Sequence, residues 1–489
     1  MIALNYKSNK TNLSVLFLVA FLVRAATFQF YVQHNERYKQ PDSMDYHNCA
    51  ISLSIGNCMY RADNLEPIFW RTPGYPVFLY AFYKLIGVTS PKFPNNSAAQ
   101  KTALWFQIFL SSLVPIFIFF LIYFLTSTLA IAWITSWIWA LHLGPVLAST
   151  YLLTEALALF FCIPFFFFFY KSFRTWGEEQ KENIRWAKNI ALAALFLGIM
   201  SWIRPMGEFV SVVATILILF LDRATWKIKF KKIGLLFLVF FTVTGAWYVR
   251  NYKITGKFFF CPMFGTYLNS FCAPKIMRDV TNVDIKKCTS LMYQFAKEKA
   301  VRDDIAAYQK GKRANKEHAA LEVALPILKK HPFIFAYNWM KEVFKTAFDL
   351  YTSQLVEFAR NTFSWDPIEE FLVEKWKDCI YKQPMSIAMR ILVFLEIIFE
   401  ILKWIGLLCG AWLFLFMPLV KRFRISDLVK KIGVLWLKTS PMIGAFIFMT
   451  GGFGYARLRL PVEPLMIMLS LTFWFYIFFF NGRTSQEAS

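Results

Sequence analysis

The feature that most constrains this chain is a series of apolar runs, each about twenty residues long. A helix of that length crosses a hydrocarbon core that is roughly 30 Å thick. Hydrophobic residues make up 57% of the 489 residues, whereas soluble domains are about 45–50% apolar. The sequence therefore predicts an all-α protein with multiple membrane-spanning helices.

About ten spans are expected. They cover residues 13–32, 104–125, 129–147, 150–170, 189–203, 208–221, 233–249, 388–419, 432–451 and 465–480. Residues 74–86 are apolar but short, which favours a helix in the membrane interface. No small-residue cleavage site follows the first run, so we interpret it as an uncleaved helix.

The runs divide the chain into three regions. Residues 1–249 form an N-terminal membrane module with a first outer loop at 33–71, and residues 387–489 form C-terminal membrane helices. Residues 250–386 are too long and polar for an ordinary connection, and their charge-mixed stretches predict a small, mostly helical extramembrane layer.

Most basic residues flank apolar runs, so the net charge of +23 indicates membrane topology and not nucleic-acid binding. The connectors 171–188, 223–232 and 421–431 each contain five Lys or Arg. Short basic loops stay in the cytoplasm. With ten spans, both termini are then cytoplasmic, in an inner membrane of bacterial type.

This topology gathers unusual polar residues at the outer face. They are Asp42 and Asp45 in the first loop, Glu155 at the start of a span, Arg204 between two spans, and Arg457 with Arg459 before the last span. Guanidinium groups suit phosphate, and several outer arginines run against the positive-inside tendency. We therefore expect a cavity for a lipid phosphate, although snorkelling at the headgroups explains single arginines.

Asp42 and Asp45 are three residues apart, so on a helix they share one face. Such a pair suits a general base or a divalent cation, with His47 as a further candidate ligand. A helix N-cap explains the same residues, since 41–45 is close to a capping box.

Six of the eight cysteines fall on the predicted outer side. They are Cys49, Cys58, Cys261, Cys272, Cys288 and Cys379. An even number in an oxidising compartment favours disulfides, with free thiols as the alternative.

Several short motifs follow one another in a specific order. Asp42-Ser43-x-x-Tyr46 comes after the first span, and Arg71-x-Pro-Gly-Tyr75-Pro closes the loop. Thr154-Glu155, Arg204-Pro205, the stretch WYVRNYKITG at 247–256 and RLRLPVEP at 457–464 follow. This order resembles bacterial GT-C glycosyltransferases of the mannosyltransferase and aminoarabinose-transferase type.

The resemblance implies a GT-C-like bundle that transfers a sugar from a polyprenyl-phosphate donor to a hydroxyl of a glycan, lipid or protein, with inversion. Asp42 matches the catalytic base, but Asp45 supplies a second acid inside the same motif, so the assignment of the base is not unique. The expected substrate contacts are Asp45, Tyr46, Arg71, Tyr75, Glu155, Arg204, Arg457 and Arg459. No cofactor is required, and a divalent cation held by Asp42, Asp45 and His47 is compatible with the motif.

Two other interpretations fit the topology. A lipid or glycan transporter would also have about ten spans and buried ions, but it predicts inverted repeats and helices broken at the midplane. A non-catalytic scaffold with the same fold is the second. The clustering of polar residues at one surface favours the enzyme.

Overall fold

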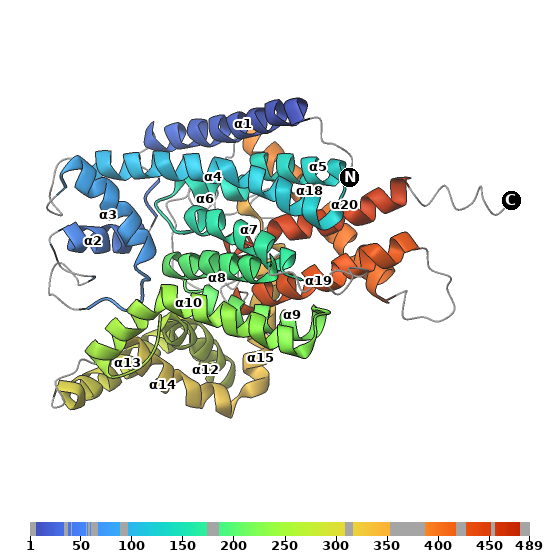
Figure 1. Cartoon of the computed structure of the whole chain (residues 1–489). Coiled ribbons are helices and arrows are strands. Elements are labelled where there is room, and N and C mark those ends of the chain that lie inside the picture. Colours follow the sequence, from blue (N-terminus) through green and yellow to red (C-terminus); the bar gives the residue numbers. More distant parts are fainter. Residues whose placement is uncertain are drawn as a thin grey trace.

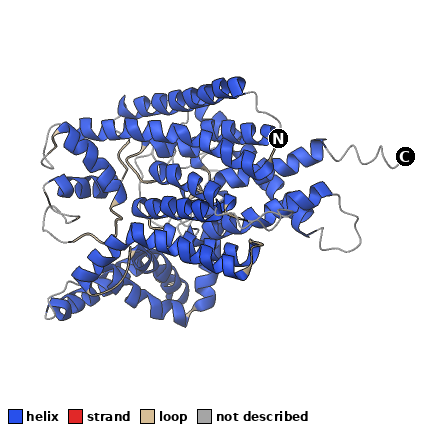
Figure 2. Ribbon diagram, viewed as in Figure 1, coloured by secondary structure: helices blue, strands red, loops and turns tan. Residues whose placement is uncertain are grey.

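The computed structural model describes residues 6–33, 38–40, 42–54, 56, 59, 67–88, 96–173, 185–308, 316–352, 387–416, 427–450 and 455–479. The elements in these ranges are helices (Figure 2). Most of them lie side by side in a bundle, with α1 along one edge (Figure 1).

Five helices of the described residues are long and apolar enough to cross a membrane. They are α1 (Tyr6–Gln33), α4 (Asn96–Thr126), α8 (Arg185–Ile203), α10 (Trp226–Thr255) and α19 (Asp427–Thr450). The shorter or more charged helices of the bundle are α7 (Glu155–Lys171), α9 (Gly207–Leu221), α18 (Ile387–Ala411), which continues into η2 (Trp412–Phe416), and α20 (Glu463–Phe479). The predicted multi-pass helical membrane protein is confirmed, while the number ten stays a prediction.

One predicted span is interrupted by a bend. Residues 129–147 are not one straight helix, because the chain bends by 46° between α5 (Leu129–Leu141) and α6 (Leu143–Thr150). His142 lies at the break, and its Nδ1 accepts a hydrogen bond from the Gly144 amide at 3.2 Å. The hydropathy pattern could not show this break, since both halves are apolar. The next helix, α7, begins at Glu155 and not at residue 150.

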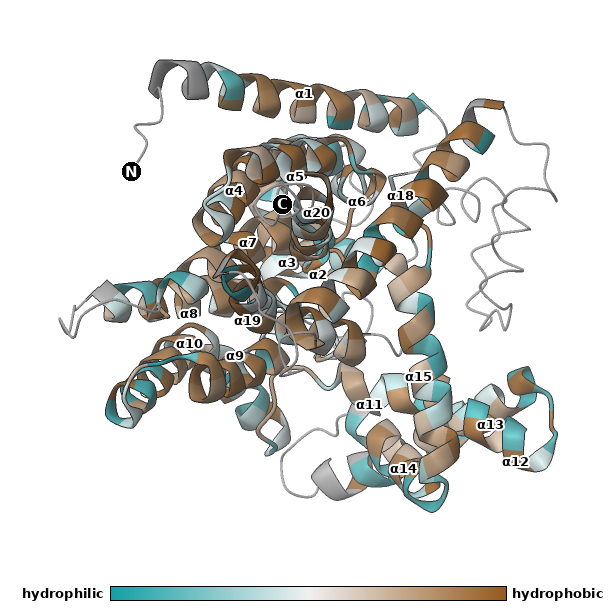
Figure 3. Cartoon of the chain, turned by 90° about the vertical axis from the view of Figure 1, so that its right-hand side faces the viewer, coloured by the Kyte–Doolittle hydropathy of each residue, from teal (hydrophilic) through white to brown (hydrophobic). Residues whose placement is uncertain are grey.

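The first loop contains α2 (Ser43–Ser54), and α3 (Gly74–Ile86) follows the loop; both helices lie beside the end of the bundle (Figure 1). The extramembrane layer comprises α11 (Met263–Tyr267), η1 (Leu268–Cys272), α12 (Ala273–Thr281), α13 (Ile285–Tyr308), α14 (Lys316–Lys330) and α15 (Pro332–Phe348). It has a hydrophobic core of its own around Tyr267, Ile276, Met292 and Trp339. In Figure 3 its helices are more hydrophilic than those of the bundle, and the predicted helical layer is confirmed.

A buried arginine joins three helices of the bundle. The Arg24 side chain on α1 donates to Ser111 Oγ on α4 at 3.2 Å and to the Ala140 carbonyl on α5 at 3.0 Å. A further bond reaches the Ala20 carbonyl at 3.0 Å. A charged side chain at membrane depth is costly, so it faces the protein interior and pairs with polar groups.

The described cysteines do not support the predicted disulfides. Cys49, Cys272 and Cys288 have free thiols, and the Cys261 thiol donates to the Trp70 carbonyl at 3.4 Å. Burial raises the pKa of the Cys49 thiol to about 12. Cys58 and Cys379 lie outside the described residues.

Candidate active site

The start of α2 is fixed against the segment before α7. The Ser43 hydroxyl donates to the Leu152 carbonyl at 2.9 Å and accepts from the Gln40 amide at 2.8 Å. Asp42 immediately precedes this anchored serine, so its carboxylate is placed opposite the first turn of α7. Neither bond goes to an amide in the first turn of α2, so these contacts do not show the predicted N-cap.

Arg71 connects the two acids of the first loop. Its Nη2 donates to Asp42 Oδ1 at 2.9 Å and to Asp45 Oδ2 at 2.8 Å. Its Nη1 donates to the Tyr46 hydroxyl at 3.3 Å, and the guanidinium lies 4.8 Å from the Tyr46 ring centre. Burial alone would lower the pKa of Arg71, but Tyr46 and the two carboxylates raise it above its ordinary value.

The segment after Arg71 packs directly on the end of α8. The Thr72 hydroxyl donates to the Ile203 carbonyl at 3.0 Å. A Cβ on Gly74 would lie 2.6 Å from the backbone of Trp202, so only glycine allows this approach. Arg204 follows α8 at once. The contact therefore brings Arg71 and Arg204 to the same cavity, although 133 positions separate them.

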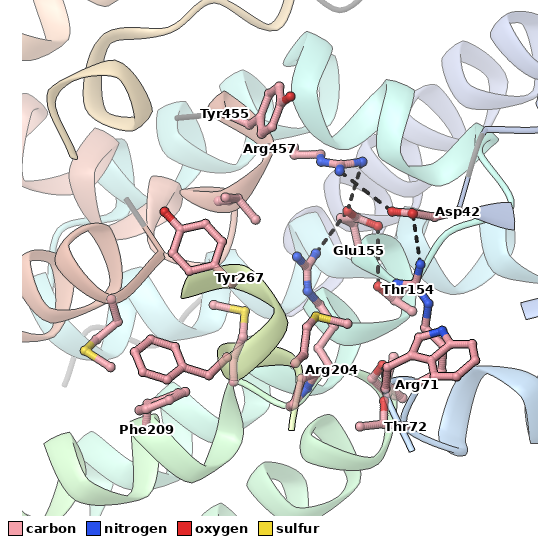
Figure 4. Close-up of a pocket in the computed structure, with 18 of the residues that line it drawn as sticks. Asp42, Arg71, Thr72, Thr154, Glu155, Arg204, Phe209, Tyr267, Tyr455 and Arg457 are labelled. Carbon is pink, nitrogen blue, oxygen red and sulfur yellow. Dashed lines mark hydrogen bonds and ion pairs between the residues drawn. The ribbon is translucent and has the colours of Figure 1, made fainter. Parts of the chain in front are cut away.

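Glu155 at the first turn of α7 pairs with two arginines. Arg204 Nη1 lies 3.1 Å from Glu155 Oε1, and Arg457 Nη1 lies 3.8 Å from the same oxygen. Arg457 Nη2 is also 3.9 Å from Asp42 Oδ2. Figure 4 shows these side chains pointing toward one another from different elements. Residues far apart in the sequence thus form one charged group.

The charged group lines one part of a cavity of about 530 Å³. The rest of the wall is largely apolar and comes mainly from α9, the extramembrane layer and α19. Its members include Phe209, Val213, Met263, Phe264, Phe271, Phe446 and Met449. The residues of this wall cannot be recognised from the sequence, because they are of the same types as the residues that face lipid. Tyr455, which also lines the cavity, adjoins a predicted motif and could have been found.

The structure brings Asp42, Tyr46, Arg71, Glu155, Arg204 and Arg457 together at the cavity. Three other predicted site residues do not line it. Asp45 lies beside Arg71, with 43% of its side chain exposed. The Tyr75 hydroxyl is buried and donates to Gln107 Oε1 at 2.9 Å. Arg459 is completely buried in a separate group of charges.

Asp42, Asp45 and His47 are not among the described residues whose ligand atoms lie close enough together to hold one metal ion. His47 Nδ1 lies 2.7 Å from the Tyr83 hydroxyl and 3.1 Å from Gln100 Nε2, within the protein interior. Burial and then Lys39 lower its pKa to about 4. Between Asp42 and Asp45 the Arg71 guanidinium takes the position that a cation would need.

No protein-family model matches the sequence, and no curated protein sequence matches it. Solved structures do. The archaeal oligosaccharyltransferase AglB from Archaeoglobus fulgidus, in complex with an inhibitory peptide and a dolichol-phosphate, has a TM-score of 0.50 at 12% identity, covering 98% of this chain and 52% of that chain. ArnT from Cupriavidus metallidurans bound to undecaprenyl phosphate has a TM-score of 0.39 at 14% identity, covering 93% of this chain and 78% of that chain.

The chain thus spans about half the length of AglB. At this level of identity the likeness concerns the fold. It extends over nearly the whole chain, including the bundle, the first loop and the extramembrane layer. The predicted all-α bundle is therefore confirmed, and this chain shares its overall fold with AglB.

Proposed function

We propose that this protein is a membrane glycosyltransferase that takes a sugar from a polyprenyl-phosphate donor and transfers it to an acceptor hydroxyl. One observation supports this most: two acids and three arginines share a cavity whose other wall is largely apolar. A lipid-linked sugar has the same two parts, a charged phosphate and a hydrocarbon tail. AglB, which shares the fold, is an oligosaccharyltransferase solved with dolichol-phosphate.

The charge of the cavity suits a phosphate. Arg71, Arg204 and Arg457 line it together with Asp42 and Glu155, which gives a formal excess of one positive charge (3 − 2 = +1). A polyprenyl-phosphate sugar is a phosphodiester with one negative charge. When the sugar leaves, the phosphate monoester approaches two negative charges. The arginines therefore favour the leaving group more than the bound donor, which is what catalysis requires.

In the proposed reaction Asp42 accepts the proton of the acceptor hydroxyl. The oxygen forms a bond to the anomeric carbon while the bond from that carbon to the phosphate oxygen breaks. The electron pair stays on the polyprenyl phosphate, and the anomeric configuration inverts. Arg71, which holds the Asp42 carboxylate at 2.9 Å, orients the base. A divalent cation is not required for this step.

Asp42 is preferred to Asp45 as the base because of position. Asp42 lines the cavity and faces Arg457, whereas Asp45 does not line it. Glu155 is the other acid of the cavity, and its closer partner is Arg204, at 3.1 Å. We assign Glu155 to orienting the arginines.

The acceptor enters from the outer face of a bacterial inner membrane, with both termini in the cytoplasm.

The test uses purified protein in lipid nanodiscs with a radiolabelled polyprenyl-phosphate hexose or pentose and a set of glycan, lipid and peptide acceptors. We expect transfer by the wild type, loss of transfer in Asp42→Asn, and retention in Asp45→Asn. Full transfer by Asp42→Asn would refute the assignment. Movement of the lipid-linked sugar across liposomes without any transfer would show a flippase instead.

A further inference from the structure

A second group of charges lies away from the cavity wall. We call Glu400, Lys403, Arg459 and Glu463 the buried ion cluster, since none of these side chains is more than 2% exposed. Arg459 Nη2 lies 2.6 Å from Glu400 Oε1, and its Nε lies 2.7 Å from Glu463 Oε2. Lys403 bridges the same two acids from α18. The cluster has two acids and two bases, so it is electrically balanced.

Arg459 also closes the end of a helix. Its Nη1 donates to the carbonyls of Thr346, Ala347 and Asp349 at 3.1, 3.0 and 2.7 Å. Helix α15 ends at Phe348, and the last carbonyls of a helix have no partner within it. A cation is favoured there by the helix dipole. Arg459 thus joins α15, α18 and α20 at one point.

The same contacts fix a short turn that reaches the cavity. The 3-10 helix η5 (Ala456–Leu458) lies directly before Arg459. At its beginning, the Ala456 amide donates to Asp349 Oδ2 at 3.2 Å, and at its end Arg459 donates to the Asp349 carbonyl. Both ends of the turn are therefore attached to one residue of the α15 terminus.

Arg457 lies in the middle of this turn and faces the opposite way, into the cavity. Its ion pairs are long, at 3.8 and 3.9 Å, and 33% of its side chain is exposed. Pairs of that length position a flexible side chain weakly. The direction of Arg457 is therefore set by its backbone, which the buried ion cluster and Asp349 hold in place.

Stability does not explain such a cluster well. Removing four charges from water is costly, and well-packed apolar side chains of similar volume often serve stability equally or better. Within a membrane protein, ionised groups are costly and are usually retained for a function. A buried network whose members are held by several ion pairs is a suitable support for a cavity residue whose position must be accurate.

We infer that Arg459 is a positioning residue, which fixes Arg457 for contact with the phosphate of the lipid-linked donor through the turn that both share. This inference rests on the proposed function. Arg459 itself does not reach the cavity. Its effect should therefore appear in donor affinity and in the Michaelis constant for the donor, and not only in folding.

The test measures binding of undecaprenyl phosphate alone and the Michaelis constant for the lipid-linked sugar. Arg459→Lys retains the charge, but an ammonium lacks the planar guanidinium that contacts two acids and three carbonyls at the same time. We therefore expect about tenfold weaker binding of undecaprenyl phosphate. Asp349→Ala is a second variant that releases the Ala456 end without removing a member of the cluster. We expect it to weaken binding in the same direction.

A matched control lies at the far end of α9. Lys232 Nζ and Asp222 Oδ2 form a buried pair at 2.6 Å, and Asp222 lies about 14 Å along the helix axis from Val213, the last cavity residue of α9. We expect Lys232→Met to lower the melting temperature but to leave undecaprenyl phosphate binding unchanged. If Arg459→Lys and Asp349→Ala behave like this control, the inference is wrong.

Arg457→Gln separates this inference from the proposed function. If Arg457→Gln leaves undecaprenyl phosphate binding unchanged, the phosphate site itself is wrongly placed and the proposed function loses its support. If Arg457→Gln weakens binding while both turn variants bind normally, only the positioning role of Arg459 fails. Weaker binding in all three variants, with normal binding in Lys232→Met, supports both.

Discussion

Replacement of Arg71 should impair the reaction more than replacement of any residue outside the cavity. The Arg71 guanidinium donates to Asp42, Asp45 and Tyr46 at the same time, and only 11% of the side chain is exposed. Arg71→Gln removes the charge that holds the Asp42 carboxylate. It also removes one of the three positive charges that line the cavity.

The magnitude follows from the contacts. A hydrogen bond to a charged group contributes about 1.5–3 kcal/mol, and each 1.36 kcal/mol corresponds to a factor of ten. Loss of the contact with Asp42 should therefore lower kcat/KM by roughly ten- to a hundredfold. The kcat/KM of Arg71→Lys should lie between those of the wild type and Arg71→Gln, because one ammonium keeps the charge but cannot replace the planar guanidinium.

Asp45→Asn is the matched comparison, because it removes the other acid partner of Arg71. Asp45 is 43% exposed, so its ion pair should contribute less than about 1 kcal/mol. The assay follows transfer of radiolabelled sugar in nanodiscs, with melting temperature as the measure of folding. Equal losses for Asp45→Asn and Arg71→Gln, or full activity in Arg71→Lys, would refute this account of the site.

Three further predictions concern the surroundings of the cavity. Gly74→Ala should lower the melting temperature and displace the Arg71 segment, because the new Cβ would lie 2.6 Å from the backbone of α8; normal stability would contradict this packing. The pKa of His47 is lowered to about 4, so between pH 4 and about 6.5 the unfolded state binds more protons than the folded state, and the free energy of unfolding should fall as the pH falls through this window. In melting curves recorded at different pH values, His47→Gln should flatten this dependence. An unchanged dependence would exclude His47 as its source. Phe333 and Phe344 are 88% and 60% exposed on one face of α15, which favours contact of this face with the bilayer. Nitroxide labels at Phe333→Cys and Phe344→Cys should therefore be accessible to oxygen, whereas a label at Lys297→Cys on α13 should be accessible to water-soluble quenchers. Accessibility of the two α15 labels to water-soluble quenchers would contradict contact with the bilayer.

Much of the architecture is readable from the sequence because lipid imposes a strict rule on composition. The apolar runs correspond to helices of the bundle, and the interfacial helix predicted at residues 74–86 is α3 with the same bounds. The break at His142 was not predicted. A bend inside an apolar stretch leaves the hydropathy unchanged, and only the packing around His142 reveals it.

The polar residues of the candidate site were also found, since charge is costly near lipid and therefore conspicuous. The side chains that these residues contact could not be predicted in the same way. In the structure Arg71 lies between Asp42 and Asp45, while His47 contacts Tyr83 in the interior. The spacing of these residues in the sequence does not predict either contact. Side-chain direction depends on neighbours that come from elsewhere in the chain, so local spacing alone does not determine it.

Arg457 and Arg459 show where the sequence ends and the tertiary structure begins. The sequence determined that both arginines lie in one short segment before the last helix, and it predicted that this segment shares a face with Asp42 and Glu155. Only the fold decided that Arg457 faces the cavity and that Arg459 is buried among Glu400, Glu463 and the end of α15. The two residues have the same chemistry, and they differ because one turn directs them toward opposite sides of the same wall.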